Sequence, residues 1–491
     1  MTSPSVILSV AKDLNIELLN DWKMKRFYVL FSAVLLSTAG LYAADGETSG
    51  SRKQESAVKQ ELRNHFKFYG FVRNFFTFDT RESVAGTGDL FYYLPKDAAM
   101  NSDGSQDLNA QTSFRFLAIT TRLGVDVTGY QYGRTKFGAK VETDFYAGLT
   151  GLTGTAQLRL RQAYMTIGWD GLSMGDRADR TASVTLKLGQ AWHPLAADQP
   201  HVTSLETGAP FNAFSRTPQV LMDANLGKHF TITSGAIWQM QYTSAGPSGS
   251  TADYIKYSGI PEMYLGFSYK AGGFLGRVGA SVLSIKPRST GVNADGVEVK
   301  VSDRITTVNP YIYLQYTKGS FQVKAKTIYS QGGEHMNLMS GYGVTSNSSP
   351  DGHWEYAPLQ TSSTWASLSY GKKWQVMLMG GYIKNLGATE DFVTSDGKTS
   401  EKNFWFSKNG FQNLNAMWRV IPTVAYNIGK FTLALEYNLT AAQYGDPELR
   451  QEAGSDGKTV DVAYYSPRGL ATDNLHWVYN SRIQMMVRFT F

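Results

Sequence analysis

From His65 to Phe491, the chain repeatedly alternates apolar and polar residues at every second position. The last run is the clearest. Its apolar residues are Ile483, Met485, Val487, Phe489 and Phe491, and its intervening residues are Arg482, Gln484, Met486, Arg488 and Thr490. A period of two gives a β-strand one apolar and one polar face. The pattern therefore predicts an all-β chain.

About sixteen such runs follow one another, most of them roughly 10–15 residues long. The predicted strands are 65–78, 113–128, 134–147, 156–170, 181–191, 216–226, 229–243, 259–271, 274–286, 303–317, 320–331, 361–371, 374–385, 415–428, 430–443 and 475–491. Strands of soluble proteins average about five or six residues. Runs twice that length suit tilted strands that cross the hydrocarbon layer of a membrane.

The connections between these runs alternate between short and long. Tight turns are predicted at Gly227-Lys228, Ala271-Gly272-Gly273, Lys318-Gly319, Gly371-Lys372-Lys373 and Gly429-Lys430. Long polar loops are predicted near 79–112, 192–215, 244–258, 287–302, 332–360, 386–414 and 444–474. This is typical of a transmembrane antiparallel up-and-down β-barrel with short periplasmic turns and long extracellular loops. An open sheet edge in lipid would leave backbone groups unpaired, so the sheet must close. Sixteen strands make a barrel wide enough for an aqueous channel.

The N-terminal region has a different pattern. Met24-Lys25-Arg26, an apolar core from Phe27 to Leu36 and small residues up to Ala43-Ala44 predict a signal peptide over 24–44. A membrane anchor is the alternative, but the apolar stretch is short for a span. Residues 1–23 would then be an untranslated upstream segment, 45–64 a short periplasmic extension and 65–491 the barrel. No later stretch approaches the 18 apolar residues of a transmembrane helix.

Composition excludes several classes of function. The sequence has no cysteine, and its basic residues are scattered despite a pI near 9.0, which argues against nucleic-acid binding. The seven histidines lack metal-site spacing, so we predict no bound metal and no cofactor. Gly171-Leu172-Ser173-Met174-Gly175 matches the G-x-S-x-G nucleophile motif. It falls in a predicted turn between strands rather than between a strand and a helix, so we predict no enzyme.

Strand parity assigns the charged residues to a water-filled lumen. The candidate pore-lining residues are Arg122, Lys140, Glu142, Asp144, Arg159, Arg161, Lys187, Lys324, Lys326, Arg419 and Glu436. Counted with Arg482, Arg488, Asp126, Asp223 and Glu262, bases outnumber acids on the polar faces ten to six, which favours a mild preference for anions. Near-neutral pairing of these charges is the alternative.

One strand breaks the parity rule. Arg159 and Arg161 should face the lumen, because a base facing lipid at the midplane costs about 2–4 kcal/mol. Met165 and Ile167 have the same parity but look lipid-facing. A β-bulge between about 161 and 165 would reconcile the two halves. A buried contact between subunits would also explain them, and both interpretations remain open.

Several motifs resemble a known family. They are Gly70-Phe71-Val72-Arg73, Lys140-Val141-Glu142-Thr143-Asp144-Phe145, Leu158-Arg159-Leu160-Arg161-Gln162-Ala163-Tyr164 and Leu188-Gly189-Gln190-Ala191-Trp192. Their order is similar to that of the Gram-negative trimeric porin superfamily, especially its DcaP-like branch. The resemblance implies a 16-stranded homotrimer whose third long loop, here 192–215, folds into the lumen. The acidic loop signature of classical general porins is not evident here.

Within that loop region, the candidate constriction residues are His193, Asp198, His201, Glu206 and Arg216. His193 and His201 could bind a metal or a substrate, or be ordinary loop residues. Phe489 and Phe491 resemble the C-terminal signal that the barrel assembly machinery recognises.

The predicted function is passive diffusion of small hydrophilic solutes, anions among them, through a porin in the lipid of the bacterial outer membrane. An adhesin or structural barrel is an alternative, and a barrel hydrolase a weaker one. Energised uptake would require a sizeable plug, and residues 45–64 are too few to form one.

Overall fold

The computed structural model describes residues 64–86, 89–146, 156–173, 181–238, 242–406, 411–454 and 457–491. Asn64–Phe491 form one compact unit. The predicted segments 1–23 and 24–44, and all of 45–64 except Asn64, lie outside the described residues.

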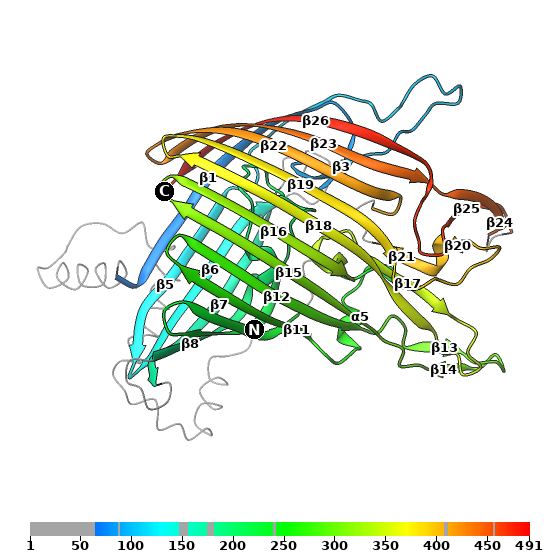
Figure 1. The fold of residues 1–491 in the computed structure, drawn as a ribbon, viewed down its shortest axis with the longest axis horizontal. Helices are drawn as coiled ribbons and strands as arrows, with labels where there is room; N and C mark the ends of the chain where they lie inside the picture. Colours follow the sequence, from blue (N-terminus) through cyan, green and yellow to red (C-terminus); the bar gives the residue numbers. More distant parts are fainter. Residues whose placement is uncertain are drawn as a thin grey trace, which may run out of the picture. The chain divides into compact units, whose positions relative to one another are not determined.

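The unit is a closed antiparallel barrel with 16 wall positions, as the alternation predicted (Figure 1). Its wall strands are β1 (Phe66–Asp79), β4 (Ser113–Leu117) with β5 (Arg122–Tyr132), β6 (Thr135–Tyr146), β7 (Gln157–Ser173), β8 (Thr181–Trp192), β9 (Arg216–Leu226), β10 (Phe230–Ile237), β11 (Glu262–Ala271), β12 (Phe274–Ile285), β15 (Ile305–Lys318), β16 (Phe321–Gln331), β18 (Glu355–Gly371), β19 (Trp374–Ala388), β22 (Leu414–Ile428), β23 (Phe431–Asp446) and β26 (Asp473–Thr490). β26 pairs back onto β1, from Phe71 opposite Thr490 to Asp79 opposite Arg482. This pairing closes the barrel.

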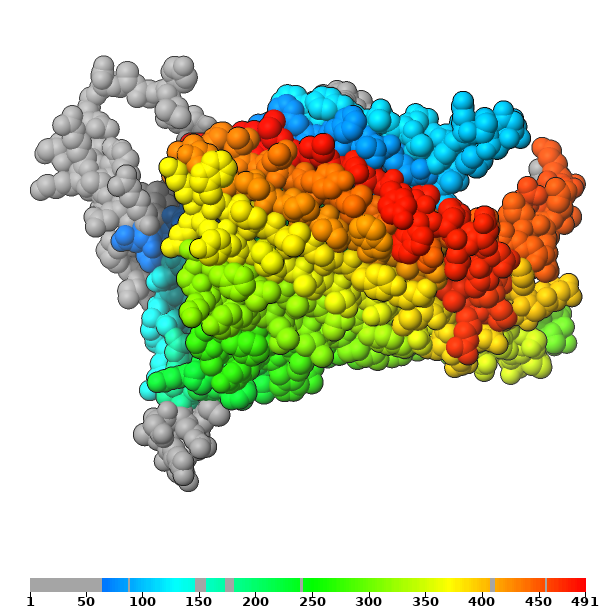
Figure 2. All heavy atoms as spheres, turned by 45° about the horizontal axis from the view of Figure 1, so that its top comes forward, coloured from blue at the N-terminus to red at the C-terminus, as the bar shows by residue number. Residues whose placement is uncertain are grey.

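The two faces of the wall differ as the sequence pattern requires. In β23, Leu433, Leu435 and Tyr437 are exposed on the outside, whereas Ala434 and Glu436 between them are buried. An outer surface of exposed apolar side chains is what a bilayer requires, because only apolar groups replace water there without cost. Figure 2 shows this outer wall, with long loops extending beyond it at one end.

Aromatic side chains gather beside the short turns. Phe230, Tyr269 and Phe274 form a row of ring contacts around the turns at 227–229 and 272–273. Trp374 contacts Tyr426 beside the turns at 372–373 and 429–430, with ring centroids 4.5 Å apart. Such a girdle marks the level of a membrane interface, where aromatic side chains are enriched. Gly272 and Gly429 adopt φ of 55° and 57° in their turns, a conformation that glycine adopts without strain.

The long loops carry further short elements at the opposite end. The additional strands are β2 (Ser83–Gly86), β3 (Phe91–Pro95), β13 (Thr290–Val292), β14 (Glu298–Lys300), β17 (Gly341–Ser346), β20 (Thr399–Ser400), β21 (Phe404–Phe406), β24 (Glu448–Ala453) and β25 (Thr459–Tyr465). The helical turns are α4 (Pro194–Ala197), α5 (Asp253–Lys256), η2 (Glu334–Met336) and η3 (Glu401–Asn403). Within the described ranges, none of the helices has the length and apolar character of a membrane span.

Three predicted strands have different limits in the structure. The strand predicted at 113–128 is interrupted at 118–121, where Thr120 adopts a φ of 73°, and then continues to Tyr132. The strand predicted at 229–243 ends at Ile237. β18 begins at Glu355 instead of 361 because β17 pairs with it and lengthens the sheet beyond the barrel wall. The alternation of apolar and polar residues within β18 does not show that a strand from a neighbouring loop will pair with it.

The parity break in β7 is a β-bulge. Thr143 of β6 lies opposite Leu160, whereas Glu142 lies opposite Gln162, so Arg161 is the extra residue. Arg159 and Arg161 therefore face inward, and Met165 faces outward with 54% of its surface exposed. Of the two interpretations left open by the sequence, the bulge is confirmed.

Candidate functional site

The lumen loop, residues 193–215, lies inside the barrel. It leaves the wall after β8, forms α4 and rejoins the wall at β9. Most of its side chains are buried, including Leu195, Phe211 and Ala213. Its contacts run from β11 to β23, across most of the second half of the wall.

Basic side chains of the wall hold the first part of the lumen loop. Lys326 of β16 donates to the Leu195 carbonyl and, at 3.1 Å, to Asn212 Oδ1. Lys324 donates to the Gln199 carbonyl at 3.1 Å. These ammonium groups therefore hold the lumen loop by its backbone carbonyl oxygens.

Asp198 and His201 lie farther along the same segment. Asp198 is ion-paired with Arg277 of β12. The backbone N–H of His201 donates to Ser367 Oγ at 3.2 Å. Burial and the nearby Lys324 ammonium lower the pKa of His201 to about 4, so its imidazole is neutral at neutral pH.

Charged groups of β22 and β23 hold the second part of the lumen loop. Arg419 donates to the Ala209 carbonyl at 3.0 Å and lies 3.7 Å from a carboxylate oxygen of Glu206. Glu436 accepts from the backbone N–H and the hydroxyl of Thr203, at 2.7 and 2.8 Å. Burial, together with the nearby Glu436 carboxylate, raises the pKa of Glu206 to about 7 against the opposing effect of Arg419.

A wall glycine makes room for the loop. An added Cβ at Gly381 of β19 would lie 2.6 Å from the ring of Phe211. The Phe211 carbonyl accepts from the hydroxyl of Ser363 on β18, at 2.7 Å. The wall is thus shaped to receive the loop as well as charged to hold it.

Two further loops also enter the barrel, which the sequence reading missed. β3 is buried, with Arg419 donating to the Tyr93 carbonyl at 2.5 Å. Phe214 of the lumen loop contacts Phe91 of β3 edge to face at 4.8 Å, and its N–H donates to the Met336 carbonyl at 2.8 Å. The available sequence signal was the unbroken apolar run Leu90–Leu94. A continuous apolar run marks a fully buried segment.

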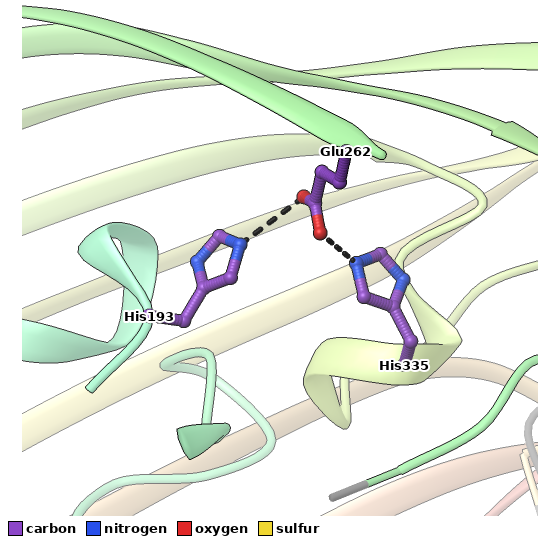
Figure 3. A group of neighbouring side chains, drawn as sticks. All are labelled: His193, Glu262 and His335. Atoms are coloured by element: carbon purple, nitrogen blue, oxygen red, sulfur yellow. Dashed lines mark hydrogen bonds and ion pairs between the residues drawn. The ribbon is translucent and has the colours of Figure 1, made fainter. Parts of the chain in front are cut away.

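Two histidines meet a carboxylate where these loops join the wall (Figure 3). Glu262 of β11 bonds Nε2 of His193 at 3.1 Å and Nε2 of His335 at 3.0 Å, and all three side chains are fully buried. Burial alone would lower the pKa of His335, but the Glu262 carboxylate raises it. The cluster fastens the lumen loop and η2 to one strand. Glu262 was assigned to a polar face, but its partners come from distant loops.

The opposite side of the lumen carries the arginine cluster, comprising Arg73, Arg122, Arg159, Arg161 and Arg216. Arg161 bonds Glu142 at 2.9 Å and Asp144 at 2.5 Å, and Arg159 bonds Asp144 at 2.9 and 3.0 Å. Arg122 lies 3.7 Å from Glu142. Arg122, Arg159 and Arg161 thus contact these two carboxylates, and with Arg73 and Arg216 the cluster has five bases for two acids, which leaves positive charge in excess.

Two members of the arginine cluster were not expected on this wall. Arg73 of β1 donates to the hydroxyl of Thr120 and stacks on Phe71 and Phe75. Arg216, expected in the constriction loop, begins β9, and its guanidinium lies over the rings of Trp192 and Phe214. Aromatic faces stabilise a guanidinium without neutralising it.

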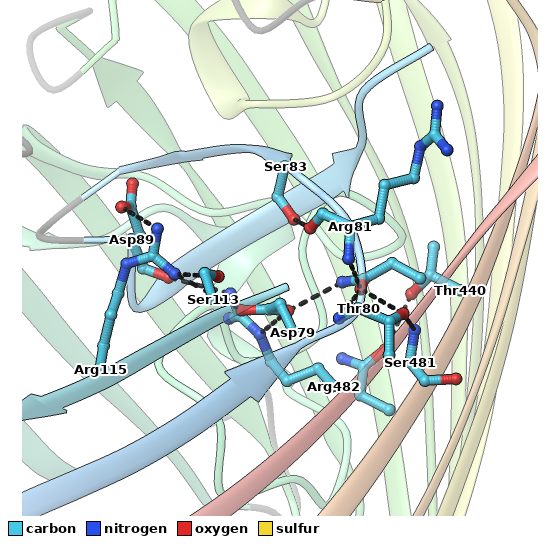
Figure 4. Close-up of polar contacts among 12 residues, drawn as sticks. Asp79, Thr80, Arg81, Ser83, Asp89, Ser113, Arg115, Thr440, Ser481 and Arg482 are labelled. Atoms are coloured by element: carbon cyan, nitrogen blue, oxygen red, sulfur yellow. Dashed lines mark hydrogen bonds and ion pairs between the residues drawn. The ribbon is translucent and has the colours of Figure 1, made fainter. Parts of the chain in front are cut away.

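The remaining predicted lumen bases lie apart from the arginine cluster. Lys140 pairs with Asp126 at 2.7 Å, and Lys187 lies over the ring of Tyr164. At the long-loop end, Arg482 bonds Asp79 at 2.8 and 2.9 Å beside Arg115 (Figure 4). A pocket of about 260 Å³ opens there. It is lined by Asp79, Arg81, Glu82, Ser83, Asp89, Lys96, Gln111, Thr112, Ser113, Arg115 and Arg482.

Phe489 and Phe491 lie outside the barrel, at the seam between β26 and β1, about half exposed. The Phe491 N–H donates to the Gly70 carbonyl at 3.0 Å. An added Cβ at Gly70 would lie 2.7 Å from the Phe491 ring. The first and last residues of the seam therefore fit each other closely.

Comparison with known proteins gives structural matches. No protein-family model matches the chain, and no curated protein matches its sequence. The outer membrane channel DcaP of Acinetobacter baumannii is similar at 16% identity over 87% of this chain and 97% of its own, with a TM-score of 0.53. The anion-selective porin of Comamonas acidovorans is 10% identical over 87% of this chain and 99% of its own, with a TM-score of 0.47. Salmonella typhi OmpF is 10% identical over 87% of this chain and 97% of its own, with a TM-score of 0.46.

The likeness to DcaP covers the whole barrel and establishes a shared fold. The closed antiparallel wall, its apolar outer surface and its charged interior agree with that likeness. The chain is a closed 16-stranded antiparallel β-barrel with an apolar outer surface, and it shares its fold with the outer membrane channel DcaP.

Proposed function

We propose that the protein is a porin of the bacterial outer membrane that lets small hydrophilic solutes diffuse passively and mildly prefers anions. The observation that carries the preference is the arginine cluster, whose five bases outnumber the two carboxylates, Glu142 and Asp144, that Arg122, Arg159 and Arg161 contact. Fixed positive charge along a pore attracts anions and repels cations. The shared fold with an outer membrane channel supports passage through the lumen.

The lumen loop, with His193, Asp198, His201 and Glu206, is the proposed constriction. Its bonds to the wall fix it across the interior, so a solute must pass between the loop and the arginine cluster. On this proposal the pore-lining residues divide into those that face the solute and those that hold the loop. Arg122, Lys140, Arg159 and Lys187 belong to the first group, and Lys324, Lys326, Arg419 and Glu436 to the second.

The test is a reversal potential measured across a KCl gradient in a planar bilayer. An anion-selective sign is expected, and the variant with Arg159→Ala and Arg161→Ala should weaken the preference. A cation-selective sign would overturn the proposal. Removing the tip of the 444–474 loop is the control, because that loop lies at the end of the barrel away from the arginine cluster and should change selectivity little.

The same proposal covers targeting and assembly. Residues 24–44 would direct export, and Phe491 would be read by the barrel assembly machinery. N-terminal sequencing of the mature protein should give a start at Ala44 or Asp45; retention of residues 1–23 would refute this. The proposed oligomer is a homotrimer, since cyclic symmetry is the usual closure for identical subunits. Light scattering in mild detergent should give a trimeric mass, and a monomeric mass would contradict it.

A catalytic role has less support. Gly171, Leu172 and Ser173 of the G-x-S-x-G match lie at the end of β7 rather than in the predicted turn, and Met174 and Gly175 lie outside the described residues. A nucleophile elbow is a turn from a strand to a helix. We therefore favour a porin over a barrel hydrolase or an adhesin.

A further inference from the structure

Three side chains that can bind a metal meet where the loop that contains Asp97 contacts the wall strands β23 and β26. Asp97 follows β3, Asp446 ends β23, and His476 lies near the start of β26. One ligand atom from each lies within 4.8 Å of the other two. These residues are far apart in the sequence, so no spacing motif announces them.

The imidazole of His476 is oriented as in a metal site. Its Nδ1 lies 2.8 Å from the Asn474 carbonyl oxygen, so Nδ1 carries a proton and donates. Its Nε2 is directed at Asp97 Oδ1, 2.7 Å away. Asn474 also donates from its side chain to Asp446 Oδ2 at 2.8 Å. Metal-binding histidines commonly donate their other ring N–H to a backbone carbonyl, which fixes the ring and the tautomer.

The charges around the site leave room for a cation. Within the described part of the chain, neither Asp97 nor Asp446 forms an ion pair with a lysine or an arginine. The nearby bases are engaged elsewhere, Lys96 with Glu82 and Lys398 with Glu448 and Asp473. Two carboxylates therefore face one imidazole, which is a suitable environment for a divalent ion.

The buried cluster of His193, Glu262 and His335 fits a metal less well, although it has two histidines. Nδ1 of His193 accepts the backbone N–H of Leu195 at 3.1 Å, so in the neutral ring the proton sits on Nε2. That proton is the one donated to Glu262. Binding a metal through Nε2 would require loss of that proton, and the cluster is fully buried.

We propose that Asp97, Asp446 and His476 bind a divalent transition metal of the zinc class at the mouth of the barrel. One imidazole nitrogen with carboxylate oxygens suits zinc, which binds nitrogen and oxygen at about 2.0–2.2 Å, whereas calcium and magnesium prefer oxygen alone. Tetrahedral ligands at that range are about 3.3 Å apart, so small side-chain rotations suffice. His476 and Asp97 are 29% and 30% exposed, which leaves a coordination position open to water.

The bound metal would brace the loop 80–112 against the wall. Asp97 lies two residues beyond Pro95, whose carbonyl accepts from the hydroxyl of Tyr444 on β23 at 2.7 Å. A metal shared by Asp97, β23 and β26 would add a second attachment beside this one. It would hold β3 in its place inside the barrel.

The test is zinc binding to the full folded chain in detergent, measured by competition with a chromogenic chelator. One zinc per chain is expected, and the affinity should fall at least about tenfold in His476→Ala and in Asp446→Asn. His353→Ala is the matched control, because His353 also pairs with an aspartate, Asp303, but Arg288 replaces the second carboxylate. Unchanged affinity in His476→Ala would overturn the proposal, as would an equal loss in His353→Ala. Displacement of the zinc by an equal concentration of calcium would also overturn it.

A second measurement needs no variant. Zinc should slow tryptic cleavage after Lys96, since a braced loop opens less often. If zinc gives no protection there while binding elsewhere on the chain, the proposed ligands are wrong.

Discussion

The lumen has two walls that use their basic residues differently. On the arginine wall, formed by β1 and by β5 to β9, guanidinium groups mostly contact residues of the same wall, as Arg161 does with Glu142 and Arg73 with Thr120. On the anchoring wall, formed by β11, β12, β16, β18, β22 and β23, bases bind instead to the inserted loops, mostly through their backbone carbonyls and, at Arg277, through the Asp198 carboxylate. Lys326 donates to the carbonyl of Leu195, and Arg419 to that of Ala209.

The two walls therefore have different roles. The bases of the anchoring wall support the inserted loops, whereas those of the arginine wall act on the ion preference of the proposed pore. The side chain of Arg419 is completely buried, whereas those of Arg159 and Arg122 are 27% and 22% exposed. A desolvated base fixed to carbonyl oxygens supports the loop, while a partly exposed base acts on passing ions through water. Variants on the two walls should therefore change different properties.

The largest effect is expected where the two walls join, at the seam between β26 and β1. A Cβ at Gly70 would lie 2.5 Å from the Arg122 carbonyl oxygen and 2.7 Å from the Phe491 ring. Gly70→Val should therefore lower the amount of folded, heat-modifiable protein in the outer membrane by about tenfold or more, since overpacking costs about 1–3 kcal/mol or more. Deletion of Phe491 should lower it as well.

The control for the seam is Gly380→Val on β19, where an added Cβ meets nothing within 4 Å. This variant should assemble normally. Normal assembly of Gly70→Val, or of the chain lacking Phe491, would show that the contact at the seam is dispensable.

The second effect concerns the anchoring wall. Arg419→Gln removes bonds to the carbonyls of Ala209 and Tyr93, so it should release the lumen loop and β3 together. Breaking a buried charged network costs about 3–5 kcal/mol. We expect a larger and noisier single-channel conductance with little change in ion preference. Lys187→Gln, on the opposite wall, should leave the conductance steady. If the single-channel conductance of Arg419→Gln is unchanged in magnitude and noise, the lumen loop is held by other contacts.

The third effect concerns the arginine wall. Arg73→Gln and Arg161→Gln each remove one positive charge, so both should lower the ratio of anion to cation permeability, by about two- to fivefold at separations of 4–8 Å in water. Only Arg161→Gln removes a guanidinium that bonds buried carboxylates, those of Glu142 and Asp144, because Arg73 donates to a hydroxyl. Arg161→Gln should therefore unfold at lower temperature, and Arg73→Gln should not. Equal thermal stability of the two variants would contradict the assignment.

The sequence predicted the barrel well because the alternation of apolar and polar residues within each strand shows which face meets lipid. Leu433 and Leu435 alternate with Ala434 and Glu436, and no distant partner is needed to see this. The bulge at Arg161 was also visible, since a change of parity requires an extra residue.

Contacts between loops were not predictable in this way. Nothing near His193 in the sequence indicates that Glu262 and His335 will join it, because the three residues come from separate loops and a strand end. The apolar run Leu90–Leu94 could have indicated that β3 is buried, but such a run resembles a buried strand of any protein and does not say where it packs. The strands of the wall can be predicted from local sequence patterns. The arrangement of side chains in the lumen cannot, because it depends on how loops from distant parts of the sequence pack together.

The smallest expected effect is a pH dependence that involves both walls. Glu206 lies on the lumen loop, neither of its carboxylate oxygens has a hydrogen-bond partner among the described residues, and burial raises its pKa to about 7. Below pH 7 the side chain is neutral, and the arginine cluster dominates the lumen. Above pH 7 the carboxylate ionises and adds one negative charge, so anion preference should decrease as pH rises through 7.

The Glu206 carboxyl also makes the stability of the folded barrel depend on pH. Its pKa is higher in the folded barrel than its ordinary value of 4.5, so the folded state binds the proton more tightly. Its contribution to stability is present in full below about pH 4.5 and is lost as pH rises through about 7. Glu206→Gln keeps the uncharged form at every pH, so it should remove this decline and flatten the pH profile of the reversal potential. Because Arg419 would still hold Ala209, the conductance of Glu206→Gln should stay near that of the natural chain. A pH profile that is unchanged in Glu206→Gln would assign the titration to another group of the lumen.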